Sequence, residues 1–118
     1  MNEYSKLIKL AESNSTTQDK LEELSKHEHY GIRYRVAKNS NTSSKILSSF
    51  ICDESISVRY ETAKNKNADV KDLVSLLKDK SSIVVDAAKK TLELKTGKEI
   101  STTTTTGIRK VKLITDYF

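Results

Sequence analysis

Apolar side chains recur along this chain at a fixed interval of 26 residues. Two positions of the pattern lie three residues apart and are apolar in every copy: Leu21 with Leu24, Leu47 with Phe50, and Leu73 with Leu76. Residues three apart share one face of a helix, so each copy predicts a helix with one apolar stripe. A period of this length is typical of stacked helical repeats, in which each unit buries its stripe against a neighbour.

The polar residues between the stripes follow the same interval. The phrase Ala11-Glu-Ser-Asn-Ser-Thr16 returns as Ala37-Lys-Asn-Ser-Asn-Thr42 and again as Ala63-Lys-Asn-Lys-Asn-Ala68. Each unit therefore reads as two short helices joined by polar turns. The pattern predicts helices near 3–12, 18–26, 30–39, 43–52, 56–65, 69–78 and 81–96.

Side chains at the ends of these segments indicate where the helices begin and end. Thr17, Asn41 or Thr42, and Asp69 are candidate N-caps, because their oxygens can accept hydrogen bonds from free helix N–H groups. Gly97 follows the last helix, where a left-handed residue would end it. The alanines at 11, 37, 63 and 88 are expected where helices approach closely.

The third unit matches the others less well after Asp79. We expect one residue to be missing there, so that Ile83 takes the place of Val58 and Ala88 the place of Ala63.

The stretch Ile32-Arg-Tyr-Arg-Val-Ala-Lys-Asn-Ser-Asn-Thr-Ser-Ser-Lys-Ile46 resembles the leucine-rich repeat variant, a relative of the HEAT repeats. That family's pattern runs Val-Arg, Val-Ala-x-Asn-Pro, Thr-Pro and Leu, and the resemblance covers about residues 4–96. Ser40, Ser43 and Lys66 stand where the family has prolines. The resemblance implies an all-α, right-handed solenoid of about 3.5 two-helix repeats. It does not imply one function.

The chain then divides into a solenoid over 1–97, a Thr-rich flexible linker over 98–107 and a C-terminal interaction peptide over 108–118. The linker runs from Ser101 through five threonines to Gly107, a composition that cannot continue the helical pattern.

Two sets of charged residues recur at fixed positions of the repeat. Arg33 and Arg59 share one position, and Asp53 precedes Arg59 by six residues. This arrangement resembles the Asp–Arg ladder between HEAT repeats, which implies a structural role for all three. A second set is a candidate basic face, diluted by nearby glutamates: Arg35, Lys38, Lys64 and Lys66.

Composition narrows the function further. The net charge of +5 is modest for a dedicated nucleic-acid binder, so DNA contact is expected to be weak or indirect. One cysteine, Cys52, and two histidines, His27 and His29, offer no metal-ligand spacing, so we expect neither a metal nor another cofactor. No catalytic constellation is present, and we expect a non-enzymatic, cytoplasmic monomer of bacterial or phage type with no membrane segment.

The last residues suggest a partner. The end of the chain resembles a sliding-clamp-binding peptide, in which an aliphatic residue precedes two aromatic residues by three positions. Ile114 occupies the aliphatic position, and Tyr117 with Phe118 forms the aromatic pair. Thr115 and Asp116 stand between them, while Val111 stands where that motif usually has Gln.

The preceding basic residues Arg109, Lys110 and Lys112 would speed encounter with an acidic clamp. The resemblance implies an adaptor that binds a DNA sliding clamp through its tail and a second partner through its helices.

Two alternatives remain open. In one, the protein is an interaction or regulatory scaffold, and its tail folds back as a structural cap on the last repeat. In the other, it is a weak DNA-binding HEAT-like module.

Overall fold

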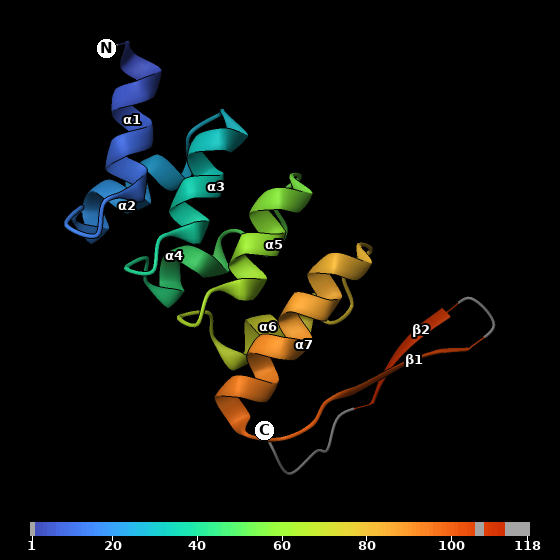
Figure 1. The fold of residues 1–118 in the computed structure, drawn as a ribbon. Coiled ribbons are helices and arrows are strands. Elements are labelled where there is room, and N and C mark those ends of the chain that lie inside the picture. Colours follow the sequence, from blue (N-terminus) through green and yellow to red (C-terminus); the bar gives the residue numbers. More distant parts are fainter. Residues whose placement is uncertain (1, 106–107, 113–118) are drawn as a thin grey trace.

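The computed structural model of the protein describes residues 2–105 and 108–112. The chain up to Ile100 is all-helical. Its seven helices are α1 (Glu3–Glu12), α2 (Gln18–Ser25), α3 (Tyr30–Lys38), α4 (Ser44–Ser48), α5 (Ile56–Lys64), α6 (Val70–Leu76) and α7 (Ser82–Thr96). They form two layers (Figure 1). Helices α1, α3, α5 and α7 lie side by side in that order, and the shorter α2, α4 and α6 cover one side of this row.

The hydrophobic core lies between the two layers. The apolar stripe that the 26-residue interval predicts is buried in every copy, with Phe50 as its largest member. Ala11, Ala37, Ala63 and Ala88 are fully buried, as expected of positions where helices pack closely. The α-layer arrangement follows from the sequence pattern, because a helix with one apolar stripe is stable only when another helix covers that stripe.

Most helix ends carry the predicted signals. The hydroxyl of Thr17 accepts a hydrogen bond from the backbone N–H of Lys20 at 3.2 Å and so caps α2. Gly97 ends α7 in the left-handed conformation, with φ of 70°. Asp69 occupies the N-cap position of α6, but its side chain makes no capping hydrogen bond.

The N-cap predicted for α4 is wrong. Its cap is Ser43, whose hydroxyl accepts from the N–H of Ile46 at 3.3 Å. Thr42 is instead buried, and its hydroxyl donates to the carbonyl oxygen of Val36 at 2.6 Å. Asn41 precedes it in the same turn.

Helix α4 is also shorter than predicted, ending at Ser48 rather than at 52. The hydroxyls of Ser48 and Ser49 donate to the carbonyl oxygens of Ser44 and Ile46. Such local side-chain bonds compete with regular helix bonding, and they account for a helix that tightens into turns here.

The expected loss of one residue after Asp79 is also wrong. Helix α7 begins 26 residues after α5, as α5 begins 26 after α3. Val84, not Ile83, takes the buried place of Val58, and Ile83 is 53% exposed. The turns before α5 and α7 are built alike, since the N–H groups of Ser55 and Ser81 each donate to the aspartate two residues earlier at 2.9 Å. This shared turn preserves the spacing.

Beyond Ile100 the backbone forms two strands, β1 (Ser101–Thr105) and β2 (Ile108–Lys112). They pair as an antiparallel hairpin in which Thr103 lies opposite Lys110. The sequence led us to expect no regular structure over 98–107. Threonine is β-branched and favours extended backbone, which is consistent with β1. The linker and peptide roles given to 98–107 and 108–118 stay predictions.

Candidate functional site

Two buried arginines join consecutive units of the helical body. The guanidinium of Arg33, from α3, donates to both carboxylate oxygens of Asp53 at 2.8 and 3.1 Å. One step along, Arg59 of α5 donates in the same way to Asp79 at 2.8 and 3.3 Å. We call these two pairs the arginine ladder.

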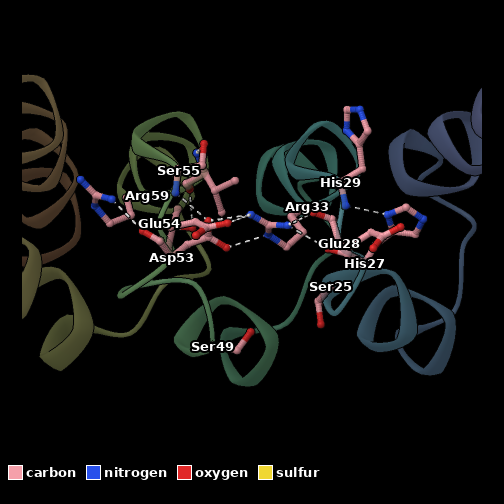
Figure 2. Close-up of polar contacts among 12 residues, drawn as sticks. Ser25, His27, Glu28, His29, Arg33, Ser49, Asp53, Glu54, Ser55 and Arg59 are labelled. Atoms are coloured by element: carbon pink, nitrogen blue, oxygen red, sulfur yellow. Dashed lines mark hydrogen bonds and ion pairs between the residues drawn. The ribbon is translucent and has the colours of Figure 1, made fainter.

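The other side of each guanidinium is also occupied. In Figure 2, Arg33 lies between the Asp53 carboxylate and the loop of His27 and Glu28, whose carbonyl oxygens each accept from it at 2.9 Å. Arg59 donates to the backbone carbonyl of Asp53 at 2.6 Å. The carboxylate of Asp53 therefore bonds Arg33, while Arg59 reaches only its backbone.

These bonds leave the ladder little capacity for a ligand. The four paired side chains are between 7 and 11% exposed. Bidentate pairing at this burial orients the side chains and fixes the spacing of neighbouring units. The sequence analysis omitted Asp79, although the interval that links it to Asp53 was visible.

The ladder also affects the ionisation of Arg33. Its pKa is raised, first because Asp53 accepts its hydrogen bonds, while burial acts in the opposite direction. A raised pKa means that this contribution to stability is complete below the unfolded-state pKa and is lost only as pH rises through the folded-state value. Arg33 is therefore charged throughout the neutral range.

The outer surface of the α1, α3, α5 and α7 row carries a second repeated set. Glu12, Lys38, Lys64 and Lys90 stand at one position of the 26-residue interval. We call the surface around Lys38, Lys64 and Lys90 the lysine face. Lys38 and Lys64 belong to the predicted basic face. Lys90 was missed because the assumed deletion moved α7 out of register.

The other two predicted members of the basic face have different surroundings. The guanidinium of Arg35 pairs with Glu12 at 2.8 Å and also donates to the carbonyl oxygen of Gly31. Lys66 is exposed in the turn after α5, where its backbone carbonyl accepts from the ammonium group of Lys95. Arg35 is thus largely neutralised within the fold.

Two tyrosines support the lysine face. Tyr34 and Tyr60 are half-buried and pack against the core. The ammonium nitrogens of Lys38 and Lys64 lie 5.8 and 5.1 Å from the centres of these rings. Both distances are within the range of a cation–π interaction, which holds each ammonium group over its ring.

Two cavities open along this row. One, of about 420 Å³, lies between α1 and α3 and has polar walls that include Glu12, Arg35 and Lys38. The other, of about 460 Å³, lies between α5 and α7. Its lining is more apolar and consists of Tyr60, Lys64, Ile83, Asp86, Ala87, Lys90, Thr91 and Leu94.

The remaining candidate residues have local roles. His29 caps α3 by accepting from the N–H of Gly31, and His27 accepts from the N–H of His29. Cys52 is exposed. Within residues 2–105 and 108–112, no cluster of three or more His, Cys, Asp or Glu side chains is arranged to hold a metal ion.

The predicted clamp-binding residues lie at or beyond the end of this range. Val111 is in β2, opposite Thr102, and the steering residues Arg109, Lys110 and Lys112 are in the same strand. Ile114, Thr115, Asp116, Tyr117 and Phe118 lie outside the described residues. Among the helices of the described part, none combines the length and hydrophobicity needed to cross a membrane.

The chain matches no protein-family model, and no curated protein or solved structure shows significant similarity to it.

Proposed function

We propose that the protein is a non-enzymatic adaptor that binds a partner polypeptide on its lysine face. In this proposal the body is a right-handed α-solenoid of about 3.5 two-helix repeats with a 26-residue period, of the leucine-rich repeat variant or HEAT-like kind. The observation that carries the proposal is the alignment of Lys38, Lys64 and Lys90 on three neighbouring helices. A row of like charges at a regular spacing is suited to an extended acidic partner.

The chemistry of the buried acids supports a binding role over a catalytic one. Asp53 and Asp79 pair with arginines, and Asp72 accepts a hydrogen bond from the hydroxyl of Ser48. Each of these carboxylates is engaged in holding the fold together. The lysines, by contrast, are exposed.

Selection of a random-peptide display library against the full chain tests this proposal. The decisive variant is K38E/K64E/K90E, and the matched control is K71E/K78E/K80E, which makes the same change of charge in and around α6. Peptides that bind the control but not the first variant support a partner site on the lysine face. Peptides that bind both variants equally well contradict it.

Short single-stranded and double-stranded DNA serve as the competing ligands in the same assay. DNA binding that falls steeply with salt and disappears in K38E/K64E/K90E would make the lysine face a nucleic-acid site, the weak DNA-binding alternative.

A second proposal concerns the end of the chain. The spacing of Ile114, Tyr117 and Phe118 favours tethering to a DNA sliding clamp, since such spacing gathers three apolar side chains on one turn. Titration of the full chain, and of a chain lacking 107–118, against bacterial and phage clamps tests this. Binding lost with the tail supports tethering. Absence of binding by both forms rejects it and leaves the tail as a cap.

A further inference from the structure

The cavity between α5 and α7 exists because one side chain of the repeated set is short. Ala87 stands one 26-residue step after Glu61 and two steps after Arg35. Arg35 spans the gap between α3 and α1 to reach Glu12 at 2.8 Å. Ala87 cannot span the corresponding gap to α5, and a cavity of about 460 Å³ remains. That volume is within the range of about 300–1,000 Å³ common for ligand pockets.

The α7 wall of this cavity is unusually apolar for an exposed surface. Ile83, Ala87 and Leu94 follow one another at helical spacing along α7 and line the cavity together. Ile83 stands where earlier units have Gly31 and Ser57, and it is 53% exposed. Leu94 is 77% exposed. Covering these side chains would remove apolar surface from water, which favours an apolar ligand.

The charges around the cavity are mainly positive. Lys64, placed over the Tyr60 ring, stands on the α5 wall, and Lys90 stands on the α7 wall. Asp86 is the acidic member of the lining. The two ammonium groups on opposite walls could therefore each meet a carboxylate that borders an apolar group in the middle.

We propose that this cavity binds a polypeptide segment in which an apolar side chain is flanked by acidic residues. The apolar side chain enters between Ile83, Ala87 and Leu94, and the flanking carboxylates pair with Lys64 and Lys90. This inference rests on the proposed function and specifies the chemistry of the partner. A nucleic-acid strand fits less well, because three aliphatic side chains in the wall offer its bases no ring and its phosphates no partner.

The experiment again uses the full chain and a random-peptide display library. Selected peptides should be enriched in an apolar residue bordered by Asp or Glu. The variant I83S/L94S should weaken their binding by about tenfold or more, because it removes the apolar contact. Ala87→Arg should do the same by filling the cavity. L10S, which removes an exposed leucine from α1, is the matched control and should leave binding within about twofold.

Helical content measured by circular dichroism establishes that each variant is folded. Peptides without an acidic–apolar pattern would overturn the inference, as would unchanged binding to both I83S/L94S and Ala87→Arg. If those peptides nevertheless require Lys38, Lys64 and Lys90, the proposed function stands while the inference fails. If they bind K38E/K64E/K90E as well as the unaltered chain, both fail.

Discussion

Asn39 and Asn65 make the same pair of hydrogen bonds to the unit that precedes each of them. The side-chain amide of Asn39 donates to the carbonyl oxygens of Ala11 and Ser13 at 2.8 and 2.9 Å. That of Asn65 donates to Ala37 and Asn39 at 2.8 and 3.0 Å. Thr91 continues the series with one bond, from its hydroxyl to Ala63 at 2.6 Å. These side chains join the C-terminal ends of successive helices.

Replacing Asn65 should therefore be costly. Asn65→Ala leaves two buried carbonyl oxygens without their donor and should lower the free energy of unfolding by about 3 kcal/mol. Asn65→Asp should cost more, because a carboxylate would face the same two oxygens and has no N–H to donate. Urea denaturation followed by circular dichroism measures both. The exposed Asn14→Ala is the control, and a loss at Asn65 no larger than at Asn14 would contradict this role.

The arginine ladder predicts strong coupling between its partners. Asp79→Ala should destabilise the protein by about 3–5 kcal/mol, since it leaves the Arg59 guanidinium buried without its carboxylate. The double variant R59M/D79L should be much less destabilised than the sum of the single changes, because it leaves no unpaired charge. A double-mutant cycle in urea gives the coupling energy, and additive effects would count against the ladder.

The end of α7 predicts a backbone effect free of packing. Gly97 has φ of 70°, and a methyl group added to it would meet no atom within 4 Å. Gly97→Ala should thus cost about 1–2 kcal/mol through its left-handed conformation alone. Gly97→Asn should cost less, because Asn tolerates this conformation better. Thermal melts rank the variants; an equal loss for both would point to a cause other than backbone conformation.

The sequence predicted best those features that depend on local chemistry. All seven helices lie where period and capping residues indicate, and Thr17 and Gly97 end their helices as predicted. The local signals failed at α4, where Thr42 and Ser43 are both acceptable caps. Only the fold decides between them, since it buries Thr42 against the carbonyl of Val36.

Features that depend on which units touch were harder to predict. The spacing of Asp53 and Arg59 is visible within one unit, but the carboxylate in fact bonds Arg33 of the unit before. Lys90 was lost through a single misplaced gap. The cavity beside Ala87 required knowing that Arg35 crosses to Glu12, a contact between residues 23 positions apart.

The arginine ladder has no rung at the first step of the row. One interval before Arg33 and Asp53 stand Leu7 and His27, which cannot form the pair. The contact between α1 and α3 relies instead on Asn39 and on the exposed pair of Arg35 with Glu12. Coupling between neighbours is therefore weakest at the N-terminal end, and in a row of units that end gives way first. Pulled from its two ends in an optical trap, the molecule should release α1 and α2 in a separate step at lower force than the rest.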